Sequence, residues 1–99
     1  MIFMLDAGAV TGSIVIPKRG RDKGLPMVVV RSEGDYCWLA DGKLRRLEHP
    51  KMKKLMHIQP TNAVAYDIKK RLENGQYLND ADIRKAISCF LGRLNDVKE

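Results

Sequence analysis

The chain has 99 residues, 44% of them hydrophobic and 30% charged, so one globular domain with a modest core is expected. This balance excludes wholesale disorder, and no apolar run approaches the roughly 20 residues of a membrane-spanning helix. The apolar start Met1–Leu5 is short and is followed by Asp6, so we expect no signal peptide, no membrane contact and a cytoplasmic protein. The net charge of +6 excludes no fold but indicates an acidic partner.

The positive charge is concentrated in the first two thirds of the chain. Residues 1–61 contain eleven Lys and Arg against six Asp and Glu, whereas residues 62–99 contain seven against six. Ten of the eighteen cations form two clusters: Lys18, Arg19, Arg21 and Lys23, and then Lys43, Arg45, Arg46, Lys51, Lys53 and Lys54. Two separate clusters on one part of the chain favour a nucleic-acid surface over a solubilising charged loop.

Residues 12–58 are typical of short β-strands. The expected strands, rich in β-branched, aromatic or alternating apolar residues, are Gly12–Pro17, Met27–Val30, Tyr36–Ala40, Lys43–Leu47 and Lys54–Ile58. Met27 and Val29 are expected on one face of the second strand, and Val28 and Val30 on the other. The dipeptide Asp41-Gly42 predicts a two-residue hairpin turn before the strand at 43–47. Five short strands at this spacing predict a small barrel or a rolled sheet.

The segment Lys18–Gly24 contains no apolar residue and two glycines, so it is predicted to be a loop. Gly20 and Gly24 allow close approach of the backbone to a phosphate, and exposed amides in such a turn can bind an anion. Further along, Tyr36 and Trp38 are two residues apart and share one face of a strand. Such a pair either stacks on nucleobases or belongs to the core, and we expect Trp38 in the core.

From Pro60 the apolar period becomes helical. The first helix is expected to begin at Thr61 or Asn62, to place Val64, Ile68 and Leu72 on one face, and to end at Asn74-Gly75. Asn79 is the predicted N-cap of a second helix, whose apolar stripe comprises Ile83, Ile87, Phe90, Leu91 and Leu94. The two helices are expected to form a hairpin that packs on the sheet, binds a protein partner or mediates self-association.

No pattern in the sequence indicates an enzyme. G-x-S-x-G, H-E-x-x-H and P-loop motifs are absent, and we see no paired carboxylates placed for acid–base catalysis. Cys37, His49, His57 and Cys89 lack the paired spacing of a zinc site, so no metal and no cofactor is expected. The cysteines are predicted to be free thiols in or near the core, and His57 is predicted to be partly buried.

Several of these segments together resemble a KOW motif: Gly12–Ile16, Gly20–Gly24 and Met27–Val30, then Leu39–Arg46 with the basic run Lys51–Lys54. The chain is similar over residues 8–60 to bacterial KOW-domain RNA-binding proteins, which look like relatives of eukaryotic-type large-subunit ribosomal proteins. Gln59–Asn62 and Asn79–Ala86 also look like the C-terminal part of the bacterial members. Lys18-Arg19 makes the loop more basic than the motif requires.

The resemblance implies an α+β protein, with a small SH3-like β-barrel of about five strands over residues 1–60 and a two-helix extension over residues 61–99. It implies binding of structured RNA, with ribosomal RNA or the ribosome as the expected partner, in translation or ribosome assembly. The candidate RNA-binding residues from the motif and the clusters are Lys18, Arg19, Gly20, Arg21, Asp22, Lys23, Gly24, Lys43, Arg45, Arg46, Lys51, Lys53 and Lys54. The alternatives are an SH3-like protein-interaction module and a transcription-associated nucleic-acid-binding factor.

Overall fold

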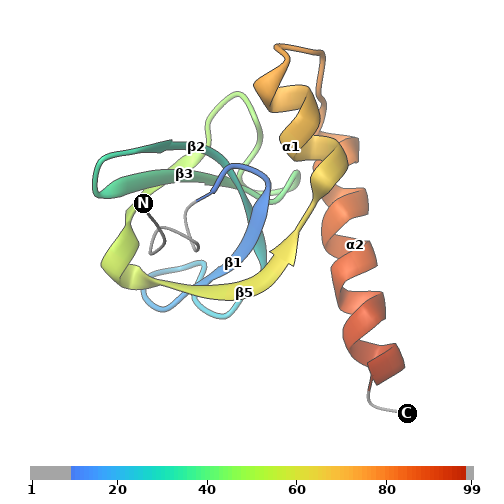
Figure 1. Cartoon of the computed structure of the whole chain (residues 1–99). Coiled ribbons are helices and arrows are strands. Elements are labelled where there is room, and N and C mark those ends of the chain that lie inside the picture. Colours follow the sequence, from blue (N-terminus) through green and yellow to red (C-terminus); the bar gives the residue numbers. More distant parts are fainter. Residues whose placement is uncertain (1–9, 98–99) are drawn as a thin grey trace.

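The computed structural model describes residues 10–97, with side chains for residues 10–92, and places five strands before two helices (Figure 1). The elements are β1 (Ser13–Pro17), β2 (Met27–Glu33), β3 (Tyr36–Ala40), β4 (Lys51–Lys54), the 3₁₀ turn η2 (Leu55–His57), β5 (Ile58–Val64), α1 (Tyr66–Glu73) and α2 (Asp80–Val97). The expected α+β class is confirmed. The expectation about Met1–Leu5 lies outside the described residues. In the part that is described, neither helix is long and apolar enough to cross a membrane.

The strands form one antiparallel sheet in the order β4-β3-β2-β1-β5. Figure 1 shows that this sheet is strongly curled. Its two edge strands, β4 and β5, are consecutive in the chain and are joined by η2. No strand pairing joins these two edges within residues 10–97, so the sheet is open and a closed barrel is not confirmed.

The inner face of the curled sheet contains the first hydrophobic core. Its members are Val15, Met27, Val29, Cys37, Leu39 and Ile58. Five of them come from alternate positions of β1, β2 and β3, because successive side chains of a strand point to opposite faces, and Ile58 is the first residue of β5. The expected division of β2 is therefore confirmed, with Met27 and Val29 on this face and Val28 and Val30 on the other.

The second core lies between the outer face of the sheet and the helices. Ile14, Val28 and Ala40 from the strands pack there with Ile68 of α1 and with Ile83 and Phe90 of α2. Ile68 and Ile83 are almost fully buried, and burial of each such side chain stabilises the fold by about 1.5–3 kcal/mol. The helices therefore form a layer on one end of the sheet, as Figure 1 shows.

The first helix begins later than the sequence predicts. Thr61 and Asn62, expected to cap it, lie in β5, and α1 begins at Tyr66. The Thr61 hydroxyl donates a hydrogen bond to the Ile14 carbonyl, and Asn62 takes a left-handed φ of 68° at an irregularity in the β1–β5 pairing. A contact with a strand far away in sequence thus extends the sheet through the residues that were expected to start the helix.

The other helix ends follow local sequence rules. Helix α1 ends at Glu73, before Asn74-Gly75, as predicted. Asn79 Oδ1 accepts a hydrogen bond from the Asp82 amide at 2.9 Å, and Asp82 Oδ2 accepts one from the Asn79 amide at 3.1 Å, which is a capping box. The predicted N-cap at Asn79 is confirmed. Leu91, however, is 44% exposed, so the expected buried stripe does not include it, and the Leu94 side chain lies outside those described.

The strand predicted at Lys43–Leu47 is wrong, and Asp41-Gly42 does not form a hairpin turn. Residues 41–50 form a loop that lies against the start of α2. Asp41 Oδ1 accepts hydrogen bonds from the amides of Lys43 and Arg45, and the Leu47 amide donates to Asp80 Oδ1 at 2.8 Å. These amides are satisfied by carboxylates, so they are not available for a strand ladder.

The partner of β3 is instead Lys51–Lys54, a basic run in which only Lys54 was expected to lie in a strand. The strand predicted at Lys54–Ile58 is also wrong. Residues 55–57 form η2, and β5 begins at Ile58. Lysine-rich β4 is an edge strand, where charged side chains remain in water and discourage pairing with another chain.

Candidate nucleic-acid interface

The first basic loop, Lys18–Gly24, connects β1 to β2 and is closed by its own backbone. The Gly24 amide donates to the Pro17 carbonyl at 3.0 Å, and the Lys23 amide donates to the Gly20 carbonyl at 3.2 Å. Gly24 has a φ of +83°, a conformation that is unfavourable for other residues. The loop therefore has a defined shape, and its four cations, Lys18, Arg19, Arg21 and Lys23, are exposed.

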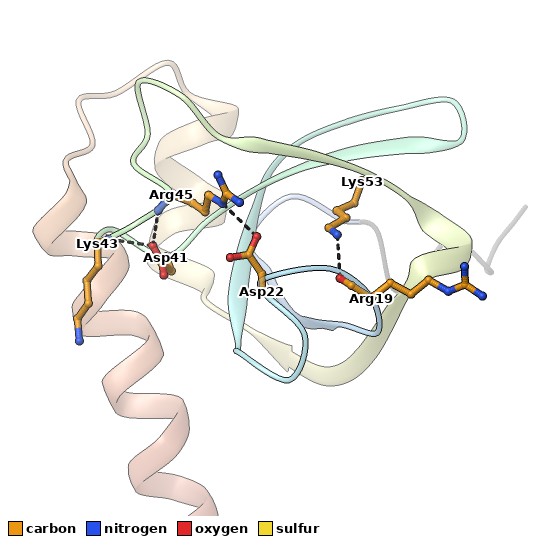
Figure 2. Close-up of polar contacts among 6 residues, drawn as sticks. All are labelled: Arg19, Asp22, Asp41, Lys43, Arg45 and Lys53. Carbon is orange, nitrogen blue, oxygen red and sulfur yellow. Dashed lines mark hydrogen bonds and ion pairs between the residues drawn. The ribbon is translucent and has the colours of Figure 1, made fainter.

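The second basic loop, Asp41–Pro50, is joined to the first through a buried carboxylate. Asp22 is only 3% exposed, and its Oδ2 accepts a hydrogen bond from Arg45 Nε at 3.0 Å. Figure 2 shows this pair between the two loops. Of the candidate RNA-binding residues, Asp22 and Arg45 are thus engaged with each other, and their contact fixes the relative position of the loops.

Strand β4 makes the second connection to the first basic loop. Lys53 Nζ donates a hydrogen bond to the Arg19 carbonyl oxygen at 2.9 Å, as Figure 2 shows. A Cβ atom at Gly20 would lie 2.8 Å from the same Lys53 Nζ, so the glycine leaves room for this lysine. The two basic clusters, which are far apart in sequence, therefore meet in the folded chain.

Most of the remaining candidate cations are free to bind a ligand. Within the described residues, no ion pair involves the exposed Lys and Arg of the two loops and β4. These are Lys18, Arg19, Arg21, Lys23, Lys43, Arg46, Lys51 and Lys54. Figure 2 shows Lys43 and Arg19 pointing away from each other on opposite sides of the Asp22–Arg45 pair, so the basic surface extends to both sides of it.

The electrostatic environment of His57 shows where several of these charges converge. Partial burial lowers the pKa of the His57 imidazole below its ordinary value of 6.5, and four neighbouring cations lower it further. In decreasing order of effect, these are Arg19, Lys54, Lys53 and Lys18. The Lys18 amide also donates to the His57 carbonyl at 2.8 Å. The corner formed by η2, β4 and the first basic loop is therefore a concentrated positive site. Its members are far apart in sequence, so the sequence around His57 alone did not predict it.

Trp38 does not belong to either core, contrary to expectation. It is half-buried on the outer face of the sheet, and the Arg31 guanidinium carbon lies 4.5 Å from the centre of its ring. Tyr36 shares this face and is 37% exposed. The alternation with the buried Cys37 and Leu39 could have predicted this outward orientation, but the role of Arg31 depends on strand pairing.

The described residues offer no cluster of side chains for a metal ion, and one of the two cysteines is buried. Within residues 10–92 no group of three or more His, Cys, Asp or Glu could hold a metal. Both cysteines are free. Cys37 is buried in the first core, but Cys89 is exposed, contrary to the expectation that it lies in or near the core. Burial raises the pKa of the Cys37 thiol to about 11, which disfavours its reactive thiolate form.

No protein-family model matches this chain, and no curated protein matches it.

Proposed function

We propose that this protein binds structured RNA without catalysis, with ribosomal RNA as the first candidate and a role in translation or ribosome assembly. The observation that carries the proposal is the ion pair between Asp22 and Arg45, which holds the two basic loops together. This contact fixes the position of one loop relative to the other, so the exposed cations around it form one surface. Such a surface fits the closely spaced phosphates of a folded RNA.

The strand arrangement is consistent with the KOW resemblance. The order β4-β3-β2-β1-β5, with a 3₁₀ turn between the edge strands, supports an SH3-like roll as the proposed fold type. In this proposal the first basic loop is the motif loop. Its exposed cations contact phosphate oxygens, and Arg19 and Arg21 can each bind a phosphate in a bidentate manner. Phosphate contacts position the protein on the shape of the RNA and do not specify its sequence.

The experiment is a salt titration of the affinity for a ribosomal RNA fragment, measured by filter binding. If about five phosphates are neutralised, the slope of log affinity against log salt is roughly −3.5 to −4.5. A slope near zero would contradict the electrostatic model. Competition with duplex DNA of equal length tests the transcription-associated alternative, which predicts that DNA displaces the RNA at comparable concentration.

A further inference from the structure

One face of the sheet beside the basic surface carries aromatic and long apolar side chains that the phosphate contacts do not use. On β3 these are Tyr36 and Trp38. Their cross-strand partners on β4 are Lys54 and Met52 respectively, so all four side chains point to the same face. Tyr36 is 37% exposed and Met52 is 51% exposed. Tyr36 lies between Lys54 on β4 and Glu33 on β2, and Glu33 is paired with Arg31. An exposed aromatic group beside an unpaired cation is a typical platform for an unpaired nucleobase.

The charges on this face are paired on the β2 side and unpaired on the β4 side. Arg31, opposite Trp38 in the β2–β3 pairing, covers the Trp38 ring and is held at 3.2 Å by Glu33, so one acidic and one basic group offset each other there. Lys54 lies on the other side of Tyr36, on the edge strand, and is one of the cations that lower the pKa of His57. The uncompensated positive charge therefore lies toward β4 and is continuous with the proposed phosphate-binding surface.

We propose that this face binds an unpaired base of the RNA, stacked on Tyr36, while Lys54 contacts the adjoining phosphate. This inference rests on the proposed function and narrows its substrate class to structured RNA that presents an unpaired nucleotide next to a helix. The cations favour a nucleotide over a peptide as the occupant, because a base and its phosphate complement an aromatic ring beside a lysine. The stacking contact accepts any base, since every base has a flat π-face.

The chain contains a single tryptophan, Trp38, so its fluorescence reports directly on this face. The probes are single-stranded oligoadenylate and a blunt-ended RNA duplex of the same length, each also labelled for an independent anisotropy measurement. We expect oligoadenylate to quench Trp38 fluorescence and the duplex to bind with little change in that fluorescence. Tyr36→Leu is expected to weaken binding of oligoadenylate by roughly fivefold or more and to leave binding of the duplex within about twofold.

Tyr77→Leu is the matched control, because Tyr77 is 79% exposed and lies in the α1–α2 connection, away from β3 and β4. It should bind both probes as the unmodified protein does. If both RNAs bind but neither changes Trp38 fluorescence and Tyr36→Leu has no effect, the base-stacking inference is overturned while the proposed function stands. If neither RNA binds, both are overturned. A Trp38 response to a proline-rich peptide, but to neither RNA, would assign the face to a protein partner and also overturn the inference.

Discussion

The two basic loops present similar charges but are stabilised in different ways. The first basic loop is closed by hydrogen bonds among its own backbone groups and leaves its exposed cations unpaired. The second is held by carboxylates and by α2: Asp41 accepts from two amides, Asp80 accepts from the Leu47 amide, and Arg84 donates to the Gly42 carbonyl at 2.7 Å. Helix α2 therefore acts on the proposed interface indirectly, by positioning the second loop, whereas the first loop is held by its own backbone and by its contacts with Arg45 and Lys53.

The largest expected difference between the loops is in stability, when one methyl group is added to either loop in two separate variants. A Cβ atom at Gly42 would lie 2.5 Å from the Asp80 carbonyl oxygen, whereas a Cβ at Gly24 would have no described atom within 4 Å. Both glycines have a φ near +80°, at +79° and +83° respectively, so the conformational cost is shared and only the packing differs. Gly42→Ala is expected to lower the free energy of unfolding by about 2–4 kcal/mol and Gly24→Ala by about 1 kcal/mol.

Urea denaturation followed by circular dichroism measures both values. Equal losses of stability for the two variants would contradict the packing of the second loop against α2. A larger loss of stability for Gly24→Ala than for Gly42→Ala would show that the first loop is the more tightly packed of the two.

The contact that joins the loops is tested by Asp22→Asn. This change removes the charge of a buried carboxylate and leaves Arg45, which is partly exposed, without its partner. We expect the free energy of unfolding to fall by about 1–3 kcal/mol, less than for a pair with both partners buried. Asp67→Asn is the control, because Asp67 forms an exposed ion pair with Arg71 one helical turn away, for which about 0.5 kcal/mol or less is expected. Thermal or urea unfolding of both variants gives the comparison, and equal effects would show that the Asp22 pair has no structural role.

A smaller effect is expected from pH, at the corner where the first loop meets β4. The lowered pKa leaves the His57 imidazole neutral near pH 7, whereas a bound phosphate favours the charged form, so RNA binding takes up a proton. Affinity is expected to increase about two- to fivefold as pH falls below 6.5, and His57→Gln should abolish the increase. The free energy of unfolding of the RNA-free protein should decrease as pH falls, because the pKa of His57 is lower in the folded chain than in the unfolded chain. If the affinity of His57→Gln for RNA still increases at low pH as in the unmodified protein, His57 does not take part in RNA binding.

The same difference between the loops explains what the sequence could predict. The first loop, the end of α1 and the N-cap at Asn79 depend on residues within a few positions of each other, and all three were predicted correctly. The second loop depends on Asp80 and Arg84, more than thirty positions away, so Asp41-Gly42 was mistaken for a hairpin turn.

The extension of β5 likewise depends on a distant group, because Thr61 bonds to the Ile14 carbonyl. For the site, the sequence showed two clusters of cations but not which of their members would be used for internal contacts. Asp22, Arg45 and Lys53 have contacts that only the folded chain reveals.

The most direct test of the central claim compares two double variants that remove the same charge. Arg21→Ala with Lys23→Ala removes two exposed cations of the first loop, and Lys70→Ala with Lys85→Ala removes two exposed cations of the helices. At low salt we expect the first variant to bind a ribosomal RNA fragment about tenfold more weakly, with a shallower salt slope, and the second to stay within about twofold of the unmodified protein. Equal weakening by both would show that net charge alone determines binding, and unchanged binding by the loop variant would contradict the proposed interface.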